Sequence, residues 1–140
     1  GRLDKDSEGL VILTDDGKLQ NKISHPKYNK IKTYIVQVEG EINDTATMAL
    51  EKGVELKDGI TKPAVVKKIE EPSWLWSRSP PIRVRKNIPT SWIEISIIEG
   101  KNRQIRRMTA SVGFPTLRLI RTSIDQWNLG NLPSGSYVTL

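Results

Sequence analysis

Apolar and polar residues alternate along several short stretches of the chain, and a period of two residues is typical of β-strands that bury one face. The clearest case is TYIVQVEG at residues 33–40, where Tyr34, Val36 and Val38 fall on one face. GLVILT at residues 9–14 is a continuous apolar run before an Asp-Asp-Gly turn, which predicts a buried strand. Strands are also expected within residues 54–71, around an Asp-Gly turn, and at residues 91–100, 116–124 and 136–140.

Three segments instead carry helix start and stop signals. They are residues 18–24, 43–53 and 102–113, and the last two close with a Gly. Residues 71–90, called here the proline-rich segment, contain four prolines and are expected to form a loop or irregular hairpin. Because strands outnumber the isolated helices, the pattern predicts an α+β fold. It is a mixed, largely antiparallel β-sheet with a few flanking helices, in one domain over residues 1–140.

The composition excludes several classes of protein. A chain of 140 residues with 36% hydrophobic and 27% charged residues suits one globular domain with a real core. The absence of cysteine excludes a disulfide framework and a thiolate site, and it fits a reducing compartment such as the cytoplasm. No apolar run approaches membrane-spanning length and no signal peptide is visible, so no membrane association is expected.

Positive charge is concentrated in the second half of the chain. The net charge is +6, yet residues 62–121 alone carry 13 Lys and Arg against 4 Asp and Glu. Such a distribution attracts polyanions through counterion release. In the proline-rich segment, Trp74 and Trp76 suit base stacking, although they would serve equally well to fill the edge of the core. The basic residues interleaved with them are predicted to bind RNA: Arg78, Arg83, Arg85 and Lys86.

Asp4, Asp6 and Glu8 occupy alternate positions near the amino terminus, and Gly9 follows them. This spacing resembles the start of a calcium loop. However, the twelfth loop position would be Asp15 where such loops use Glu, and only three residues precede Asp4. A solvated acidic turn is the second interpretation. The third is one reactive carboxylate, which needs a nearby cation and an aromatic or basic partner.

Arg103, Arg106 and Arg107 are the densest local group of cations. They stand at positions i, i+3 and i+4 of the helix predicted at residues 102–113, so they are expected to share one flank of it. Glu99 and Gly100 lead the chain into this helix. Taken alone, the cluster indicates a phosphate-binding or solvated helix face.

Three stretches together resemble the rRNA pseudouridine synthases of the RsuA/RluB type. They are GRLDKDSEGLVILTDDG, KTYIVQVEG, and EGKNRQIRRM followed by GFPTLRLIR, and their order and spacing match over nearly the whole chain. The resemblance implies the catalytic fold of this family. The family's Asn-Lys-Pro strand and the S4-type RNA-binding domain of many members are not found in the sequence. Residues 1–140 are therefore expected to be a catalytic domain without its first strand.

The resemblance also implies roles for individual residues. Asp4 would be the nucleophile, and Tyr34 would stack on the uracil ring and serve as a general base. Arg106 would pair with the Asp4 carboxylate and keep it ionised. Arg2 would contact the RNA backbone or replace the flipped nucleotide, and Leu119 would form the floor of the uracil pocket. The remaining basic residues of the motifs would bind RNA or support local structure: Arg103, Arg107 and Arg121.

The implied activity is the isomerisation of a specific uridine to pseudouridine in 23S rRNA. Its partner would be 23S rRNA or the large-subunit precursor, and the acting form a monomer. The reaction breaks and rejoins a glycosidic bond without net oxidation, so neither a cofactor nor a metal is expected. Attack at the anomeric carbon, attack at pyrimidine C6 and elimination from the sugar all remain open. The alternative function is a non-catalytic RNA-binding module or ribosome-assembly factor, which the basic second half and the missing first strand would support.

Overall fold

The computed structural model describes residues 4–25, 28–78, 80–83, 85 and 87–139, and its architecture confirms the α+β prediction. Within these ranges, the largest unit is a six-stranded sheet with the order β1-β7-β2-β6-β5, and β8 also pairs with β7. β1 runs parallel to β7 and the other pairings are antiparallel. β3 and β4 form a separate hairpin. The bounds are β1 (Glu8–Gly9), α1 (Gly17–Ser24), β2 (Lys32–Glu39), α2 (Asp44–Lys52), β3 (Glu55–Leu56), β4 (Gly59–Ile60), β5 (Val65–Ile69), β6 (Thr90–Ile97), α3 (Gln104–Ser111), β7 (Thr116–Ile124) and β8 (Trp127–Asn128).

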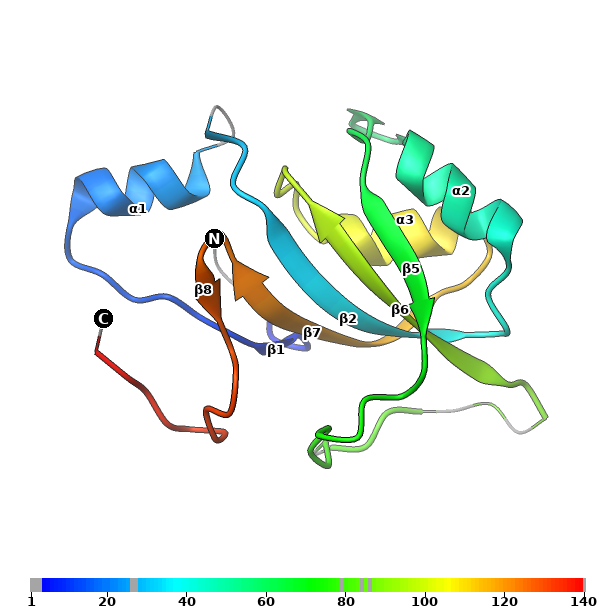
Figure 1. Ribbon diagram of the computed structural model, residues 1–140. Helices are drawn as coiled ribbons and strands as arrows, with labels where there is room; N and C mark the ends of the chain where they lie inside the picture. Colours follow the sequence, from blue (N-terminus) through cyan, green and yellow to red (C-terminus); the bar gives the residue numbers. More distant parts are fainter. Residues whose placement is uncertain (1–3, 26–27, 79, 84, 86, 140) are drawn as a thin grey trace.

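Helices α2 and α3 lie on the same side of the sheet, and the main hydrophobic core fills the space between them and the strands (Figure 1). Val36 of β2, with Ile93 and Ile95 of β6, is fully buried there. Leu50 of α2 and Met108 of α3 are fully buried from the other side. Each such side chain contributes about 1.5–3 kcal/mol by leaving water. This core therefore holds β2 and α3, which both carry candidate site residues, in a fixed relation.

The opposite face of the sheet has a smaller core around Ile35, Trp92 and Ile120. Leu75 and Trp76 of the proline-rich segment pack against this cluster. Residues 75 and 76 of the segment therefore lie against the sheet.

The strand predicted at residues 9–14 is wrong beyond Gly9. Val11 and Leu13 are 49% and 90% exposed, and the last backbone hydrogen bond to β7 runs from Leu10 N–H to the carbonyl of Arg121. The parallel register pairs Gly9 with Arg121, so further pairing would place residues 11 and 12 against residues 123 and 124 of β7. That part of the β7 edge is already paired with β8.

The strand predicted at residues 136–140 is also wrong over its described part, 136–139, which has no strand. Tyr137 and Val138 are 89% and 65% exposed. The last strand is β8, which follows a tight turn through Asp125 with a left-handed φ of 52°. The strands predicted at residues 33–40, 91–100 and 116–124 and the three helices are confirmed within a few residues. Over the part of the chain that is described, no helix combines the length and the apolar character needed to cross a membrane.

Candidate active site

A pocket of about 150 Å³ lies where the loop around Asp4, strands β2 and β7, and the start of α3 meet. This volume is smaller than the roughly 300–1,000 Å³ of sites for drug-sized ligands, so the pocket suits a group the size of a single base. Five of the residues selected from the sequence line it: Asp4, Tyr34, Arg103, Leu119 and Arg121.

The carboxylate of Asp4 forms an ion pair with Arg103, with 3.7 Å between Oδ2 and Nη1. The two side chains are 30% and 47% exposed. The carbonyl of Asp4 accepts a hydrogen bond from Ser7 N–H at 3.0 Å, which closes a tight turn. The family resemblance implies Arg106 as the partner of this carboxylate, and the structure places Arg103 there instead.

Arg106 of α3 holds the backbone of the loop that carries Asp4. Its Nη2 donates to the carbonyl of Asp6 at 3.2 Å and to Ser7 Oγ at 3.4 Å. Burial, followed by the nearby charge of Arg103, lowers the pKa of Arg106, and the charges of Asp6 and Asp4 oppose this shift. Its Nε is buried without a hydrogen-bond partner among the described residues, and such a donor costs about 1–3 kcal/mol.

Buried polar contacts fix where α3 begins. Gln104 accepts a hydrogen bond from Lys101 N–H at 3.1 Å and donates to Glu99 Oε1 at 2.9 Å. Glu99 also accepts from Lys62 N–H at 2.7 Å. Arg103, directly before the helix, has a left-handed φ of 51°, a conformation that costs a non-glycine residue about 1–3 kcal/mol. The network around Gln104 holds the chain in this conformation, in which Arg103 reaches Asp4.

Tyr34 and Leu119 provide apolar surface on neighbouring strands. Tyr34 of β2 pairs with Arg121 of β7, and Val36 pairs with Leu119. Tyr34 is half-buried against the main core, and Leu119 is 5% exposed. An aromatic ring beside an aliphatic side chain suits a planar ligand such as a nucleobase.

Two buried cations also line the pocket. Arg121 is 2% exposed and donates from Nε to the carbonyl of Leu10 at 2.9 Å, which favours a role in local structure. Lys32, which is not among the site residues predicted from the sequence, is 7% exposed. Burial, and then the charge of Arg121, lowers the pKa of Lys32, whereas Glu99 raises it. The Lys-x-Tyr motif could have indicated Lys32, because Lys32 and Tyr34 are residues i and i+2 of one strand and therefore share a face.

Arg107 is engaged outside the pocket. It donates to both carboxylate oxygens of Asp58, at 2.8 and 3.2 Å, and from Nε to the carbonyl of Asn102 at 3.0 Å. The hydrogen bond between them lowers the pKa of Asp58 and raises that of Arg107. Arg103 and Arg106 both reach the loop at residues 4–7, whereas Arg107 reaches Asp58. The expectation that all three share one flank is therefore wrong for Arg107. For Arg107, the contacts favour a structural role.

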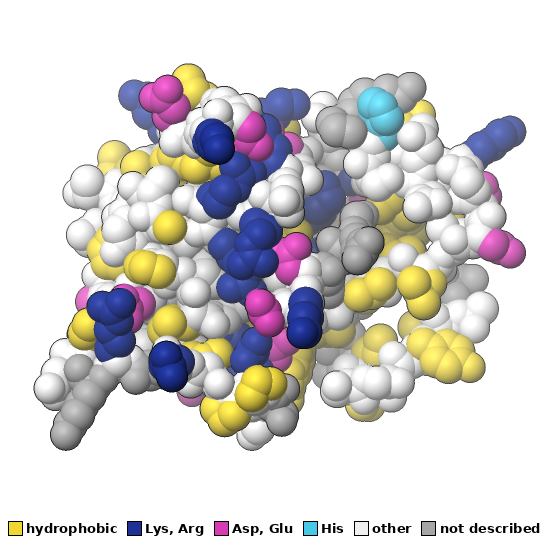
Figure 2. All heavy atoms as spheres, turned by 180° about the vertical axis from the view of Figure 1, so that it is seen from behind, with side chains coloured by type: hydrophobic (Ala, Val, Ile, Leu, Met, Phe, Trp, Pro, Cys, Tyr) yellow, Lys and Arg dark blue, Asp and Glu magenta, His cyan; other side chains and the backbone are white. Residues whose placement is uncertain are grey.

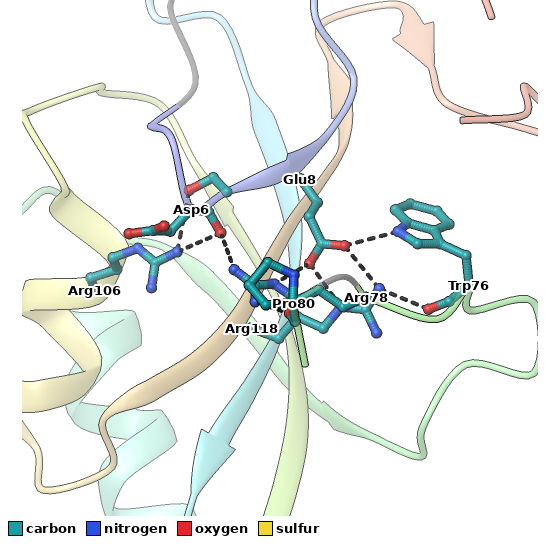
Figure 3. Close-up of polar contacts among 8 residues, drawn as sticks. Asp6, Glu8, Trp76, Arg78, Pro80, Arg106 and Arg118 are labelled. Carbon is teal, nitrogen blue, oxygen red and sulfur yellow. Dashed lines mark hydrogen bonds and ion pairs between the residues drawn. The ribbon is translucent and has the colours of Figure 1, made fainter. Parts of the chain in front are cut away.

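Glu8 is the centre of a second polar cluster, on the face of the sheet opposite to α2 and α3 (Figure 3). Its carboxylate accepts hydrogen bonds from Arg118 Nε at 2.8 Å, Arg118 Nη2 at 2.9 Å and Trp76 Nε1 at 2.8 Å. These donors occupy the oxygens that a calcium ion would need. Within the described ranges, no three His, Asp or Glu side chains gather as metal ligands would. These contacts disfavour the calcium-loop interpretation, and the view of Glu8 as a solvated turn residue is wrong, since its side chain is 16% exposed.

Some of the RNA-binding residues predicted in the proline-rich segment contact other protein side chains, and others are exposed to solvent. Arg78 forms an ion pair with Glu8 at 3.4 Å and is largely buried. Trp74 is 52% exposed, and its ring centroid lies 5.9 Å from that of Trp76. Arg83 is exposed, and Arg85 forms an ion pair with Glu39 at 3.3 Å. Lys86 of this segment and Arg2 near the amino terminus lie outside the described residues.

Basic side chains gather on one face of the molecule. Figure 2 shows Lys and Arg in a band across this face, with acidic side chains set between them. The pocket itself is lined by four basic residues: Lys32, Lys101, Arg103 and Arg121. Such a concentration of positive charge attracts a phosphate backbone.

A mixed sheet that brings a carboxylate, a tyrosine and several cations around one small pocket has the arrangement of an enzyme domain. A family model described as RNA pseudouridylate synthase matches residues 1–111, and the chain belongs to this family.

Named relatives cover nearly the whole chain. A ribosomal large subunit pseudouridine synthase E from Vibrio parahaemolyticus is 56% identical over 98% of the chain, and one from Xanthomonas campestris is 53% identical over 98%. The chain spans 57% and 73% of the lengths of these two relatives. A solved structure described as a pseudouridylate synthase is 30% identical, with a TM-score of 0.71, over 92% of this chain and 49% of its own. The segment EPSWLWSRSPPIRVRKNIPTSW likewise resembles enzyme E.

Proposed function

We propose that the protein isomerises a uridine of 23S ribosomal RNA to pseudouridine, with Asp4 as the nucleophile. The observation that carries this proposal is that Asp4, Tyr34 and Leu119, which come from three separate motifs, line one small pocket. The names of the relatives from Vibrio parahaemolyticus and Xanthomonas campestris support large-subunit RNA as the substrate.

The proposed chemistry is an isomerisation whose atoms balance without a co-reactant. The bond between N1 and C1′ breaks, a bond between C5 and C1′ forms, the proton on C5 leaves and N1 gains one. Asp4 attacks C1′ or C6, or takes part in an elimination from the sugar, and each route needs its carboxylate beside the reacting atoms. The ion pair with Arg103 supports the placement of that carboxylate.

The target base must leave the RNA stack before Asp4 can reach it. We assign Tyr34 as the platform for the flipped base and as the general base for the C5 proton, and Leu119 as the floor of the pocket. Arg106 holds the loop around Asp4. Arg2 is proposed from the sequence alone to contact the RNA backbone.

RNA contacts outside the pocket are assigned to Trp74, Arg83 and Arg85, whose exposure supports this role. Lys86 is assigned from the sequence alone. Arg78, Arg107 and Arg121 are proposed to act through the protein structure instead, because each is engaged by other residues.

We further propose that the protein acts as a monomer in the cytoplasm. Asp4, Tyr34 and Leu119 of one chain meet in one pocket, so these three residues need no second copy to come together. A ribosomal RNA substrate supports the location.

Tritium release from 5-tritiated uridine in unmodified large-subunit RNA tests the proposal in the full-length protein. The wild type should release tritium, and Asp4→Asn should release none while its RNA affinity and unfolding midpoint stay close to the wild type. Asp15→Asn is the matched control, because Asp15 is an exposed acid outside the pocket. Full activity of Asp4→Asn would refute the assignment of Asp4 as the nucleophile. RNA binding without release from the wild type would support the non-catalytic RNA-binding module.

A further inference from the structure

Glu8 ties the loop that carries Asp4 to residues 74–78 of the proline-rich segment. Figure 3 shows its carboxylate between Arg118, Arg78 and the indole of Trp76. Arg118 and Trp76 donate hydrogen bonds to it at 2.8–2.9 Å, and Arg78 Nε lies 3.4 Å from Oε2. One carboxylate therefore joins β1, β7 and the proline-rich segment.

The charges at this junction are shielded from water. The side chains of Glu8, Arg118 and Arg78 are 16%, 7% and 18% exposed. Hydrogen bonds between charged groups are about twice as strong as neutral ones. Arg118 Nη2 also donates a hydrogen bond to the backbone carbonyl of Trp76 at 2.8 Å. The guanidinium carbon of Arg118 lies 5.7 Å from the centroid of the Trp76 ring. Glu8 is the carboxylate that both arginines contact.

The same loop is also held at the carbonyl of Asp6. This carbonyl accepts hydrogen bonds from Arg78 Nη2 at 3.4 Å and from Arg106 Nη2 at 3.2 Å. Arg78 comes from the proline-rich segment and Arg106 from α3, so the carbonyl lies between two separate elements (Figure 3). Asp6 is two residues from Asp4. The contacts therefore form a continuous path from Trp76 through Glu8 and Arg78 to the loop of the proposed nucleophile.

We propose that Glu8 is a positioning residue for Asp4, and that the Trp76–Glu8–Arg118 junction fixes the nucleophile loop in its reactive place. This inference rests on the proposed function. The register between Glu8 and Ile120 fixes the backbone that follows the loop, and the Glu8 side chain fixes Arg78, which holds Asp6. Displacing a reacting group by about 1 Å can slow a reaction on the order of 100-fold.

The test compares Glu8→Gln and Trp76→Phe with the wild type, in the full-length protein on unmodified large-subunit RNA. At saturating RNA, Glu8→Gln should lower the single-turnover rate constant on the order of 10- to 100-fold. Trp76→Phe loses one donor to Glu8 and should lower it about threefold. RNA affinity should change by less than about twofold in both variants. Glu94→Gln is the control, because Glu94 pairs with Lys67 at 3.9 Å on the same sheet face and lies away from the loop.

Stability needs separate control, because Glu8→Gln leaves two guanidinium groups uncompensated. Rates are therefore measured well below each unfolding midpoint, on variants whose circular dichroism matches the wild type. Trp76→Phe keeps every charge and tests the same junction if Glu8→Gln does not fold. The double variant Glu8→Gln/Arg118→Met should lose less than the product of the two single losses, because both changes remove the contact between Glu8 and Arg118.

Wild-type rate constants in folded Glu8→Gln and Trp76→Phe would overturn the inference. A loss confined to RNA affinity would also overturn it, because the junction would then serve docking. Failure of the proposed function gives a different result, since the wild type itself would then release no tritium.

Discussion

Arg103 pairs with Asp4 at 3.7 Å from a position just before α3, while Arg106, one turn further on, binds the carbonyl of Asp6 and the hydroxyl of Ser7. Two arginines of one motif thus act on the same loop in different ways. One faces the carboxylate, and the other holds the backbone that presents it. The pair with Arg103 is half-exposed, whereas Arg106 is half-buried and makes two contacts to the loop.

Arg106→Met should therefore slow the reaction more than Arg103→Met. A partly exposed ion pair is worth up to about 1 kcal/mol, so Arg103→Met should cost about fivefold in the rate constant at saturating RNA. Arg106→Met frees the loop and should cost on the order of 100-fold. Single-turnover tritium release measures both, with circular dichroism as the control for folding. A larger loss of the rate constant in Arg103→Met would contradict this prediction and show that the ion pair between Asp4 and Arg103 matters more for the rate.

Gly9→Ala should detach β1 from β7. Gly9 has a φ of 105°, and a Cβ there would collide with the backbone carbonyl of Arg121. Such a backbone conformation costs a non-glycine residue about 1–3 kcal/mol before the collision is counted. Thermal unfolding should show a clearly lower midpoint. Gly17→Ala is the matched control, because a Cβ at Gly17 meets nothing within 4 Å, and its midpoint should stay at or above the wild-type value.

The motifs predicted the centre of the pocket because they combine local pattern with family resemblance. Alternation along residues 33–40 placed Tyr34 on the buried face, and the Leu-x-Arg motif supplied Leu119. Lys32 and the role of Glu8 were missed for a physical reason. The partners of Glu8 are Trp76, Arg78 and Arg118, and they are distant in sequence, so no local pattern reveals which carboxylate a buried arginine will meet.

The two wrong strand predictions show a limit of the same kind. GLVILT has the composition of a buried strand, and Leu10 is indeed buried in a separate cluster with Ile23 of α1. Whether such a run becomes a strand depends on a free neighbouring edge. The edge of β7 pairs with β1 over two residues and then with β8. Which segment pairs with this edge depends on the whole fold and not on the local sequence.

Trp74→Ala should weaken RNA binding without slowing the reaction at saturating RNA. The side chain is 52% exposed and therefore available to stack on a base, and removal of one stacked base contact costs about 1–3 kcal/mol. The dissociation constant should rise roughly 5- to 150-fold, as measured by filter binding at fixed salt. Tyr137→Ala is the control, because Tyr137 is an 89% exposed aromatic residue outside the proline-rich segment. Equal losses in the two variants would argue against a specific stacking site.

Lys32→Met should change how stability depends on pH. Burial and the charge of Arg121 lower the pKa of Lys32 below 10.5, so between the lowered value and 10.5 the unfolded chain binds more protons than the folded one. Wild-type stability should therefore rise with pH in that window through this group, as the cost of the buried charge is removed. The free energy of unfolding of Lys32→Met should exceed that of the wild type most at neutral pH. This difference should shrink toward about pH 10. Urea unfolding across this range measures the difference, with exposed Lys57→Met as the control, for which it should stay constant. A constant difference for Lys32→Met as well would show that folding does not perturb this lysine.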